Sequence, residues 1–173
     1  MACDISLGRA EFCKDSIGGL SAVYIMNFDN SQEFLFNSDG VLTDAGGGDS
    51  YKYELKGTST FEQNITSSRE NGSTFVDQKL TLNLKKLSIT DHKQLKILSY
   101  GRPRIFIEDN NGNIFLAGLE KGMELVTSII STGAAMGDVS GYKLEFIGTE
   151  IILAPFIAEN SLSEIGISVI VGT

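Results

Sequence analysis

The chain has 173 residues and a formal net charge of −8, with 14 Lys and Arg against 22 Asp and Glu. This length suits one domain, which can bury roughly two thirds of the surface that its unfolded form exposes. The acidic balance argues against a surface that grips phosphates, because non-specific nucleic-acid binding relies on clustered Lys and Arg. Residues 151–158 form the longest apolar run, which is too short to span a bilayer, and no signal-peptide pattern opens the chain. We therefore expect a soluble protein that is made in a cytoplasm and has no membrane partner.

The first twenty residues are polar and run into the pair Gly18 and Gly19, which is typical of an arm outside a core. Both cysteines, Cys3 and Cys13, lie in this stretch. Their spacing fits neither a zinc ribbon nor a redox motif, so no metal site is expected, although a small disulfide loop stays open. We predict an N-terminal arm, residues 1–20, whose order depends on something outside itself, such as a neighbouring copy.

The next stretch predicts a buried strand and then a loop. Residues 22–28 are almost continuously apolar and rich in β-formers, which indicates a strand buried on both faces. After a turn at 29–31, we expect residues 33–36 to pair back onto it. Residues 37–50 contain a further turn and three consecutive glycines at 46–48, which favour flexibility over regular structure. A projecting loop is predicted here.

A long hairpin is predicted from residues 51–66 and a strand that begins near Ser73, with Gly72 in the turn. Strands of this length exceed the usual five or six residues, so the pair forms a ribbon that extends beyond its own domain. Such a ribbon usually needs a partner. Its tip, residues 67–72, is charged and polar, and we expect it to meet another subunit.

The second strand of this ribbon alternates and leads into one helix. Leu80, Leu82 and Leu84 share one side while polar residues occupy the other, the period of a half-buried strand. Thr90 can then cap a short helix in which Leu95 shares a face with another leucine three residues on. This is the one convincing helix in the sequence.

The remainder of the chain predicts further strands. Residues 102–119 form a hairpin about the turn at 109–113, and residues 123–130 read as a strand with two apolar faces. A glycine-rich connector leads to the alternating strand at 142–148, and the last strand alternates over 165–171.

No internal repeat or linker divides the chain after the arm. We expect a mainly β fold, either a β-sandwich or a curled antiparallel sheet, with one short flanking α-helix. Residues 21–173 make up this single domain.

One loop partly matches the sequence pattern of a calcium site. Four oxygen-bearing residues match ligand positions of a calcium-binding helix-loop-helix: Asp109, Asn111, Asn113 and Glu120. However, Ile114 stands where that motif requires glycine, and the flanks are strands instead of helices. A hairpin turn is therefore the better interpretation.

The sequence proposes no catalytic constellation. His92 is the single histidine, and it lies at the start of the predicted helix, where a surface histidine is expected. A general base needs a nucleophile or a substrate groove beside it, and neither is indicated. We expect no enzyme activity, no catalytic or metal-binding residue and no cofactor.

Three stretches carry a resemblance to a known family: CDISLGRAEFCKDSIGGLSAVYIMNF, RIFIEDNNGNIFLAGLEKGMEL and STGAAMGDVSGYKLEFIGTE. They resemble the small tail-tube-type structural proteins of tailed bacteriophages, particularly of phages that infect Bacteroidetes. The resemblance covers about residues 3–156 and rests on glycines and alternating strands. It implies a β-sandwich or curled sheet flanked by a helix, assembled as rings, usually hexameric, that stack around a channel for DNA.

The resemblance implies a virion protein of the tail, assembled in the host cytoplasm, whose partners are identical copies and neighbouring tail or connector proteins. Genomic DNA would pass through during ejection without specific binding, and we expect Asp and Glu to outnumber Lys and Arg on the inner face of the ring. Residues of the projecting segments are the candidates for subunit interfaces: Asp39, Gly46, Gly47, Gly48, Arg69, Glu70 and Asn71.

Three alternatives stay open. The protein can be a head-to-tail adaptor or a single ring of a short tail. In a different class, it can be a monomeric ligand- or carbohydrate-binding β-sandwich, with exposed Tyr51, Tyr53 and Tyr142 forming a binding platform.

Overall fold

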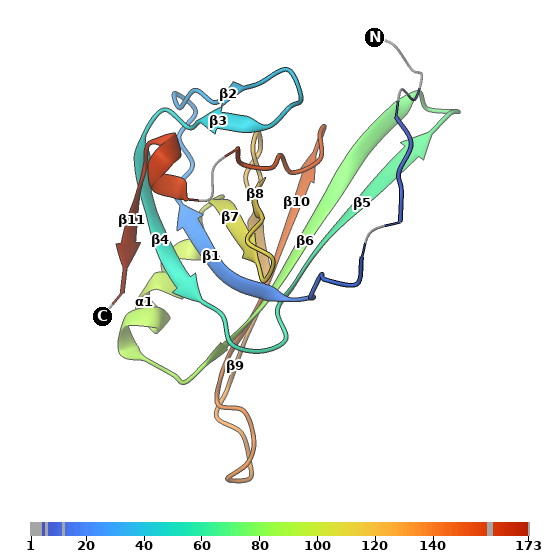
Figure 1. Ribbon diagram of the computed structural model, residues 1–173. Coiled ribbons are helices and arrows are strands. Elements are labelled where there is room, and N and C mark those ends of the chain that lie inside the picture. Colours follow the sequence, from blue (N-terminus) through green and yellow to red (C-terminus); the bar gives the residue numbers. More distant parts are fainter. Residues whose placement is uncertain (1–4, 6, 12, 159–160, 173) are drawn as a thin grey trace.

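The computed structural model describes residues 5, 7–11, 13–158 and 161–172, and it is mainly β with one α-helix (Figure 1). The elements in chain order are β1 (Leu20–Met26), β2 (Leu35–Phe36), β3 (Leu42–Asp44), β4 (Gly48–Glu54), β5 (Thr60–Ser68), β6 (Ser73–Lys85), α1 (Ile89–Leu98), β7 (Arg104–Asp109), β8 (Ile114–Ala117), β9 (Glu124–Ser131), β10 (Gly141–Glu150), the 3-10 helix η1 (Leu162–Ile165) and β11 (Ile167–Val171). The predicted mainly β fold with one short helix is therefore confirmed.

A five-stranded sheet has the order β11-β4-β1-β7-β8. Its central strand β1 pairs antiparallel with β4 and β7, and it is buried on both faces, as the apolar run predicted. Val23 enters one hydrophobic cluster while Tyr24 enters the other. A strand with apolar side chains on both faces needs cover on both, so this sheet forms the middle layer of the protein.

A four-stranded antiparallel sheet has the order β5-β6-β10-β9 and covers one face of the five-stranded sheet. The predicted alternation holds on β6 and β10. Leu80 and Leu82 on β6, with Leu144 and Phe146 on β10, are buried against the face that carries Val23. The main core therefore lies between the two sheets, as in a β-sandwich.

The opposite face of the five-stranded sheet is covered by short elements instead of a sheet. Phe106 and Leu116 pack there against Leu42 of β3, Ile157 and Ile165 of η1. The sequence predicted Ile165 as part of the last strand, but Gly166 with a φ of 86° ends η1, and β11 begins one residue later. The strand then pairs parallel with β4.

The cap of helix α1 lies two residues earlier than predicted. The cap is Ser88, in extended conformation, whose hydroxyl accepts a hydrogen bond of 3.0 Å from the Asp91 backbone amide. Thr90 lies inside the first turn and is exposed, so its prediction as the cap was wrong. Leu95 is buried and Leu98 packs against the main core, as expected from their shared face.

The predicted hairpin from residues 51–66 is divided between the two sheets. β4 pairs with β1 in the five-stranded sheet, whereas β5 pairs with β6 in the four-stranded sheet. Leu55, in the connection between them, is buried in the core and so fixes the crossing. Because β4 occupies the edge of β1 opposite β7, residues 33–36 cannot pair back onto β1, and β2 pairs with β3 instead.

The segment 37–50 is only in part the loop that the sequence predicted, because residues 37–40 form an exposed turn and the rest is mostly strand. It contains β3 and the start of β4, and Leu42 and Ala45 are fully buried. Its glycines serve a tight turn, because Gly46 has a φ of 67° and an added Cβ would lie 2.8 Å from the Glu33 carbonyl oxygen. The glycines that predicted a flexible loop are instead needed for a left-handed backbone conformation that only glycine adopts easily.

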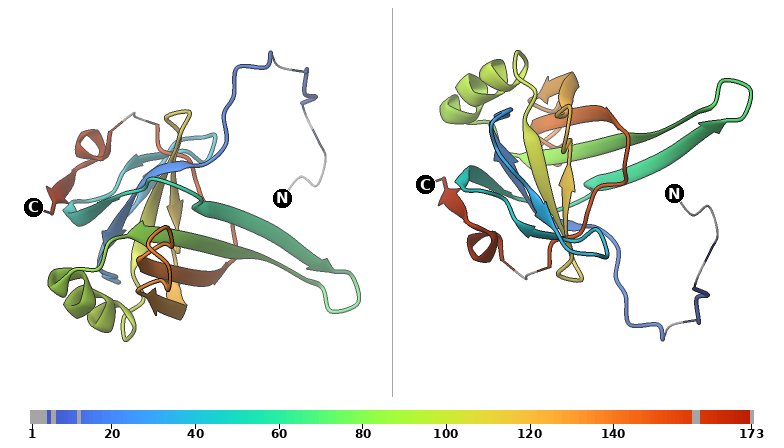
Figure 2. Two further views of the ribbon diagram at one scale, coloured as in Figure 1. Left: turned by 90° about the horizontal axis from the view of Figure 1, so that it is seen from below. Right: turned by 90° about the horizontal axis from the view of Figure 1, so that it is seen from above.

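Two segments project from the same side of the domain. The hairpin of β5 and β6 continues beyond the sandwich as a narrow ribbon, and the N-terminal arm leaves the domain toward the same side but diverges from the ribbon (Figures 1 and 2). The described part of the arm up to Gly19 contains no helix or strand and is exposed.

Candidate self-assembly surface

The four-stranded sheet ends in two strands with one partner each. β5 pairs with β6 and β9 pairs with β10, so within the described residues their outer edges carry no further strand. Such an edge presents unpaired backbone donors and acceptors that can pair with another chain. Since β5 and β9 lie on opposite sides of one sheet, the two open edges differ and face away from each other.

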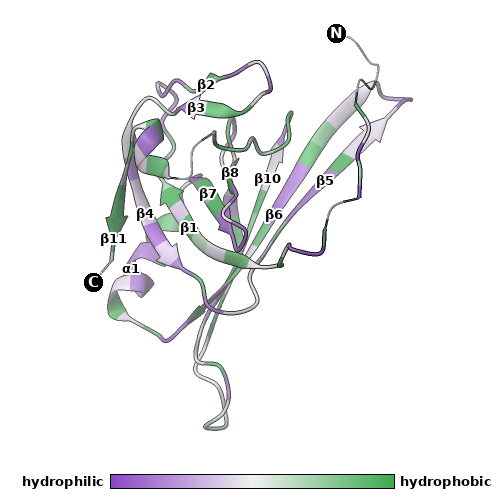
Figure 3. Cartoon of the chain, in the orientation of Figure 1, coloured by the Kyte–Doolittle hydropathy of each residue, from purple (hydrophilic) through white to green (hydrophobic). Residues whose placement is uncertain are grey.

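The five-stranded sheet is protected differently at its two sides. Beside β8, the Leu116 amide donates to the Pro155 carbonyl and the Ile157 amide donates to the Ile114 carbonyl, and each hydrogen bond is 3.0 Å long. The other edge strand, β11, is apolar except for Ser168 (Figure 3), and its Val171 is 61% exposed. β11 is thus a third open edge, of a different composition.

β9 has the apolar residues that the sequence predicted, but apart from Leu125, which packs partly against the main core, they are exposed. Val126, Ile129 and Ile130 are about half exposed, at 51%, 51% and 47%. Neighbouring residues of a strand point to opposite faces, so Ile129 and Ile130 expose apolar surface on both faces of the sheet. An edge strand with this surface is a predicted association site.

The outer face of the four-stranded sheet is polar and carries both signs of charge. Residues directly opposite in the ladder share a face, and Lys143, Glu145 and Ile147 of β10 face outward. With their neighbours, the charged residues on this face are Glu62, Asp77, Lys79, Lys85, Glu124, Lys143 and Glu145. Lys79 and Glu145 form an ion pair, and the hydrogen bond from Lys79 lowers the pKa of Glu145. Acidic residues slightly outnumber basic ones.

The candidate interface residues lie in three separate places. Arg69, Glu70 and Asn71 are exposed at the tip of the ribbon, and Asp39 is exposed in the turn between β2 and β3. The structure does not bring these two groups into one surface.

The three glycines of this set contact their own chain. Gly46 donates to the Asp44 carboxylate over 2.8 Å, and the Gly47 carbonyl accepts from the Gln32 side-chain amide over 2.6 Å. Gly48 pairs with Ile167 in the ladder between β4 and β11.

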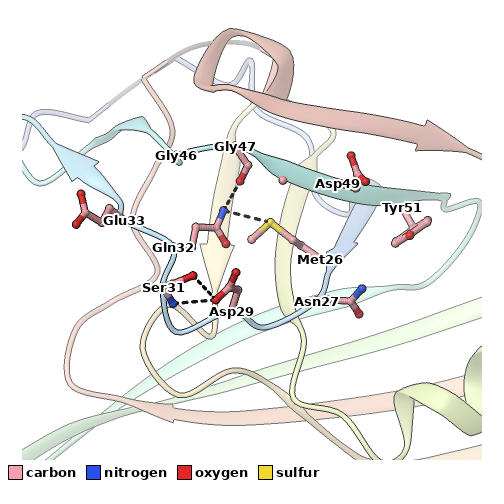
Figure 4. A pocket seen from close by; sticks show the side chains of 11 residues that line it. Met26, Asn27, Asp29, Ser31, Gln32, Glu33, Gly46, Gly47, Asp49 and Tyr51 are labelled. Carbon is pink, nitrogen blue, oxygen red and sulfur yellow. Dashed lines mark hydrogen bonds between the residues drawn. The ribbon is translucent and has the colours of Figure 1, made fainter.

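These glycines line an open hollow of about 630 Å³ between β1, β4 and the segment 27–33 (Figure 4). In this hollow the Asp29 carboxylate accepts from the hydroxyl and the backbone amide of Ser31, which lowers the pKa of Asp29. The described residues contain no cluster of metal-ligating side chains.

A buried arginine that the sequence reasoning missed fixes the segment beside this hollow. Arg104 is 4% exposed and donates from Nε to the Leu119 carbonyl over 2.8 Å and from Nη1 to the Asp29 carbonyl over 2.9 Å. Its guanidinium also lies 4.2 Å from the ring centre of Phe28 and 4.8 Å from that of Phe34. Burial lowers the pKa of Arg104, because removing the charged guanidinium from water is unfavourable. The hydrogen bonds and ring contacts offset this cost.

The tyrosines proposed as a binding platform do not form one. Tyr142 is 2% exposed and Tyr53 packs against the main core, which leaves Tyr51 as the exposed member. The Tyr142 hydroxyl donates to the Ser88 carbonyl and lies 3.0 Å from Nδ1 of His92. His92, in the first turn of α1, thus contacts a buried tyrosine of β10.

Comparison of the chain with known protein families, curated proteins and solved structures finds no match. The fold defines the class to which the chain belongs: mainly β proteins with two packed sheets, one α-helix and open sheet edges. No described helix has the length and apolar character needed to cross a membrane.

Proposed function

We propose that this protein is a structural virion protein of a bacteriophage tail that self-assembles into rings around a channel for DNA. The observation that carries the proposal is the pair of unlike open edges, β5 and β9, on one sheet. Pairing β9 of one copy with β5 of the next is a heterologous contact, and such contacts generate rings when the rotation closes. Each copy then leaves no open edge in that sheet.

The lengths and surfaces of the two edges suit this contact. β5 has nine residues and β9 has eight, so the two can pair along nearly their whole length. Apolar side chains at Ile129 and Ile130 would gain cover that the single copy does not give them. Sheets continued between subunits are a common way to satisfy backbone at an edge.

In such a ring the four-stranded sheets form one continuous wall. A wall whose exposed face mixes Thr, Asn and balanced charges, with a small acidic excess, would let phosphates move past without adhering. This face supports a channel for DNA that passes without specific binding. The resemblance to tail-tube proteins noted in the sequence agrees with this arrangement.

The first test is the assembly state of the purified protein. Sedimentation and negative-stain images are expected to give annuli, and stacked tubes if the protein builds a long tail. Isolated annuli that never stack would favour the head-to-tail adaptor or a short tail. A protein that stays monomeric at high concentration and binds glycans would refute the ring and support the monomeric binding module.

A matched pair of double variants tests the edge itself. Ile129→Lys with Ile130→Lys places two charges on β9 and is expected to abolish rings while leaving a folded monomer, because charged edges resist strand addition. Ile89→Lys with Ile97→Lys makes the same change on exposed positions of α1 and serves as the control. Rings that survive the β9 change, or are lost equally in the control, would show that β9 is not the contact.

A further inference from the structure

An apolar patch remains exposed beside β5 and includes one residue of that strand. It consists of Ile65, Ile151, Ile152, Leu153 and Phe156, which are 56%, 62%, 44%, 49% and 49% exposed. The Ala154 amide donates to the Gln63 side chain over 2.7 Å, which holds the segment that follows β10 against β5. Phe156 also packs on Phe115 with ring centres 4.6 Å apart. A contiguous apolar surface of this kind marks an interaction site.

The N-terminal arm is fixed at its root and exposed beyond it. The Asn111 side-chain oxygen accepts from the Ile17 backbone amide at 2.9 Å, and its side-chain nitrogen donates to the Ile17 carbonyl at 2.8 Å. The Asn110 side chain donates to the Gly18 carbonyl at 2.7 Å. These bonds set the direction in which the arm leaves the domain, on the side to which the ribbon also projects (Figure 2). Farther out, Ile5 and Leu7 are 94% and 85% exposed.

The arm has the alternating apolar pattern of a β-strand, but its described residues belong to no sheet. Ile5 and Leu7 are two residues apart, so in extended chain they share one face. The arm of the same copy leaves the apolar patch exposed, and the patch leaves the arm exposed. Each surface has the composition that would cover the other.

We propose that the arm of one copy lies across the apolar patch of the adjacent copy and inserts Ile5 and Leu7 into it. This inference rests on the proposed ring. Because the arm leaves on the side of the open β5 edge, it points toward the neighbour that supplies β9 to that edge. The arm then crosses the neighbour's sheet to reach the patch on the far side.

The reach of the arm is sufficient for this crossing. Twelve residues separate Ile5 from Ile17 at the fixed root, and an extended chain of that length spans up to about 40 Å. Four strands spaced by about 4.8 Å place the outer strands of the neighbour's sheet roughly 15 Å apart. The arm therefore reaches the patch with residues to spare for contact.

The size of the combined contact matches a stable interface. The twelve arm residues from 5 to 16 and the nine of β5 give one side 21 residues, within the roughly 20–30 that standard interfaces use on each side. Strand pairing alone would give fewer than half of that number. The arm thus supplies what the paired edges lack.

The charge of the arm also suits an identical partner. Between Ile5 and Ile17 the sequence has two basic and two acidic residues, Arg9, Lys14, Glu11 and Asp15, in a chain whose formal net charge is −8. A segment without net charge approaches an acidic neighbour without the repulsion that two acidic surfaces would have.

Disulfide trapping tests the proposal directly. In a chain with Cys3→Ser and Cys13→Ser, Leu7→Cys is combined with Leu153→Cys, and assembled protein is oxidised mildly. An arm on the adjacent copy is expected to give a covalent ladder of dimers and larger species on a non-reducing gel. The control combines Leu7→Cys with Ile97→Cys on α1, which is similarly exposed at 57% and should give no ladder.

The other outcomes separate this inference from the proposed ring. A band that runs as a cross-linked monomer would mean that the arm folds onto its own patch, which would overturn the inference. Rings without any cross-link would overturn it as well and leave the ring standing. Absence of both rings and cross-links would refute the proposed function together with the inference.

Discussion

The buried Arg104 gives a sharp test of how the segment beside the hollow is held. Arg104→Met keeps most of the side-chain volume and removes the hydrogen bonds to the carbonyls of Leu119 and Asp29, along with a weaker one of 3.3 Å to Gln32. Hydrogen bonds to charged groups contribute about 1.5–3 kcal/mol each. The variant leaves the Leu119 carbonyl without this donor, whereas the Asp29 carbonyl keeps a 3.3 Å hydrogen bond from the Gln32 backbone amide, and it also removes the cost of burying a guanidinium. We expect a net loss of about 2–4 kcal/mol in the free energy of unfolding.

The assay is urea unfolding at a protein concentration where sedimentation shows monomers, because assembly would add stability of its own. Arg102→Met is the matched control: Arg102 is exposed and lies 5.3 Å from the same Phe28 ring. Its loss should cost less than about 1 kcal/mol, the value of an exposed contact between a cation and a ring. If the two variants are equally stable, or Arg104→Met costs less than about 1 kcal/mol, the proposed role of Arg104 is wrong.

Two further predictions concern local polar contacts. Ser88→Ala is expected to cost about 1 kcal/mol because it removes the cap of α1, whereas Thr90→Ala should be near neutral; equal effects in thermal unfolding would contradict the cap assignment. For Asp109, burial acts to raise the pKa, but hydrogen bonds from Asn113 and Asn111 outweigh it, so the pKa is lowered. Its contribution to stability is then present above the unfolded pKa near 3.9 and lost as pH falls through the lower folded value. Unfolding measured between pH 5 and pH 2 should therefore show a weaker pH dependence in Asp109→Asn, and an unchanged profile would refute this.

The hairpin at residues 109–113 shows how far a local signal reaches. The sequence predicted a turn there, and the Asp109 carboxylate accepts the backbone amides of Asn111 and Asn113, both over 2.8 Å. The contact of the same loop with the arm was not predictable, because it joins residues 94 apart in the chain. Local hydrogen bonds follow from residue type, whereas contacts between distant segments depend on the packing of the whole domain.

The candidate site shows the same division. The sequence predicted an arm, a ribbon and a need for partners, and it named the exposed residues at the ribbon tip, such as Arg69. It also named Gly46, Gly47 and Gly48 as an interface, although these glycines form a turn that contacts its own chain. A run of glycines indicates unusual backbone freedom, but whether that freedom gives a mobile loop or a tight turn depends on neighbours such as Gln32.

The sequence by itself determined which residues of a strand face the core, because a period of two assigns each side chain of β6 and β10 to one face. Only the tertiary structure decided which strands lie side by side. The same apolar alternation is compatible with several neighbours, so β4 joined β1 instead of β6, and the apolar strand β9 became an exposed edge. Strand pairing between distant segments depends on the combined packing of both sheets, which no single stretch of sequence encodes.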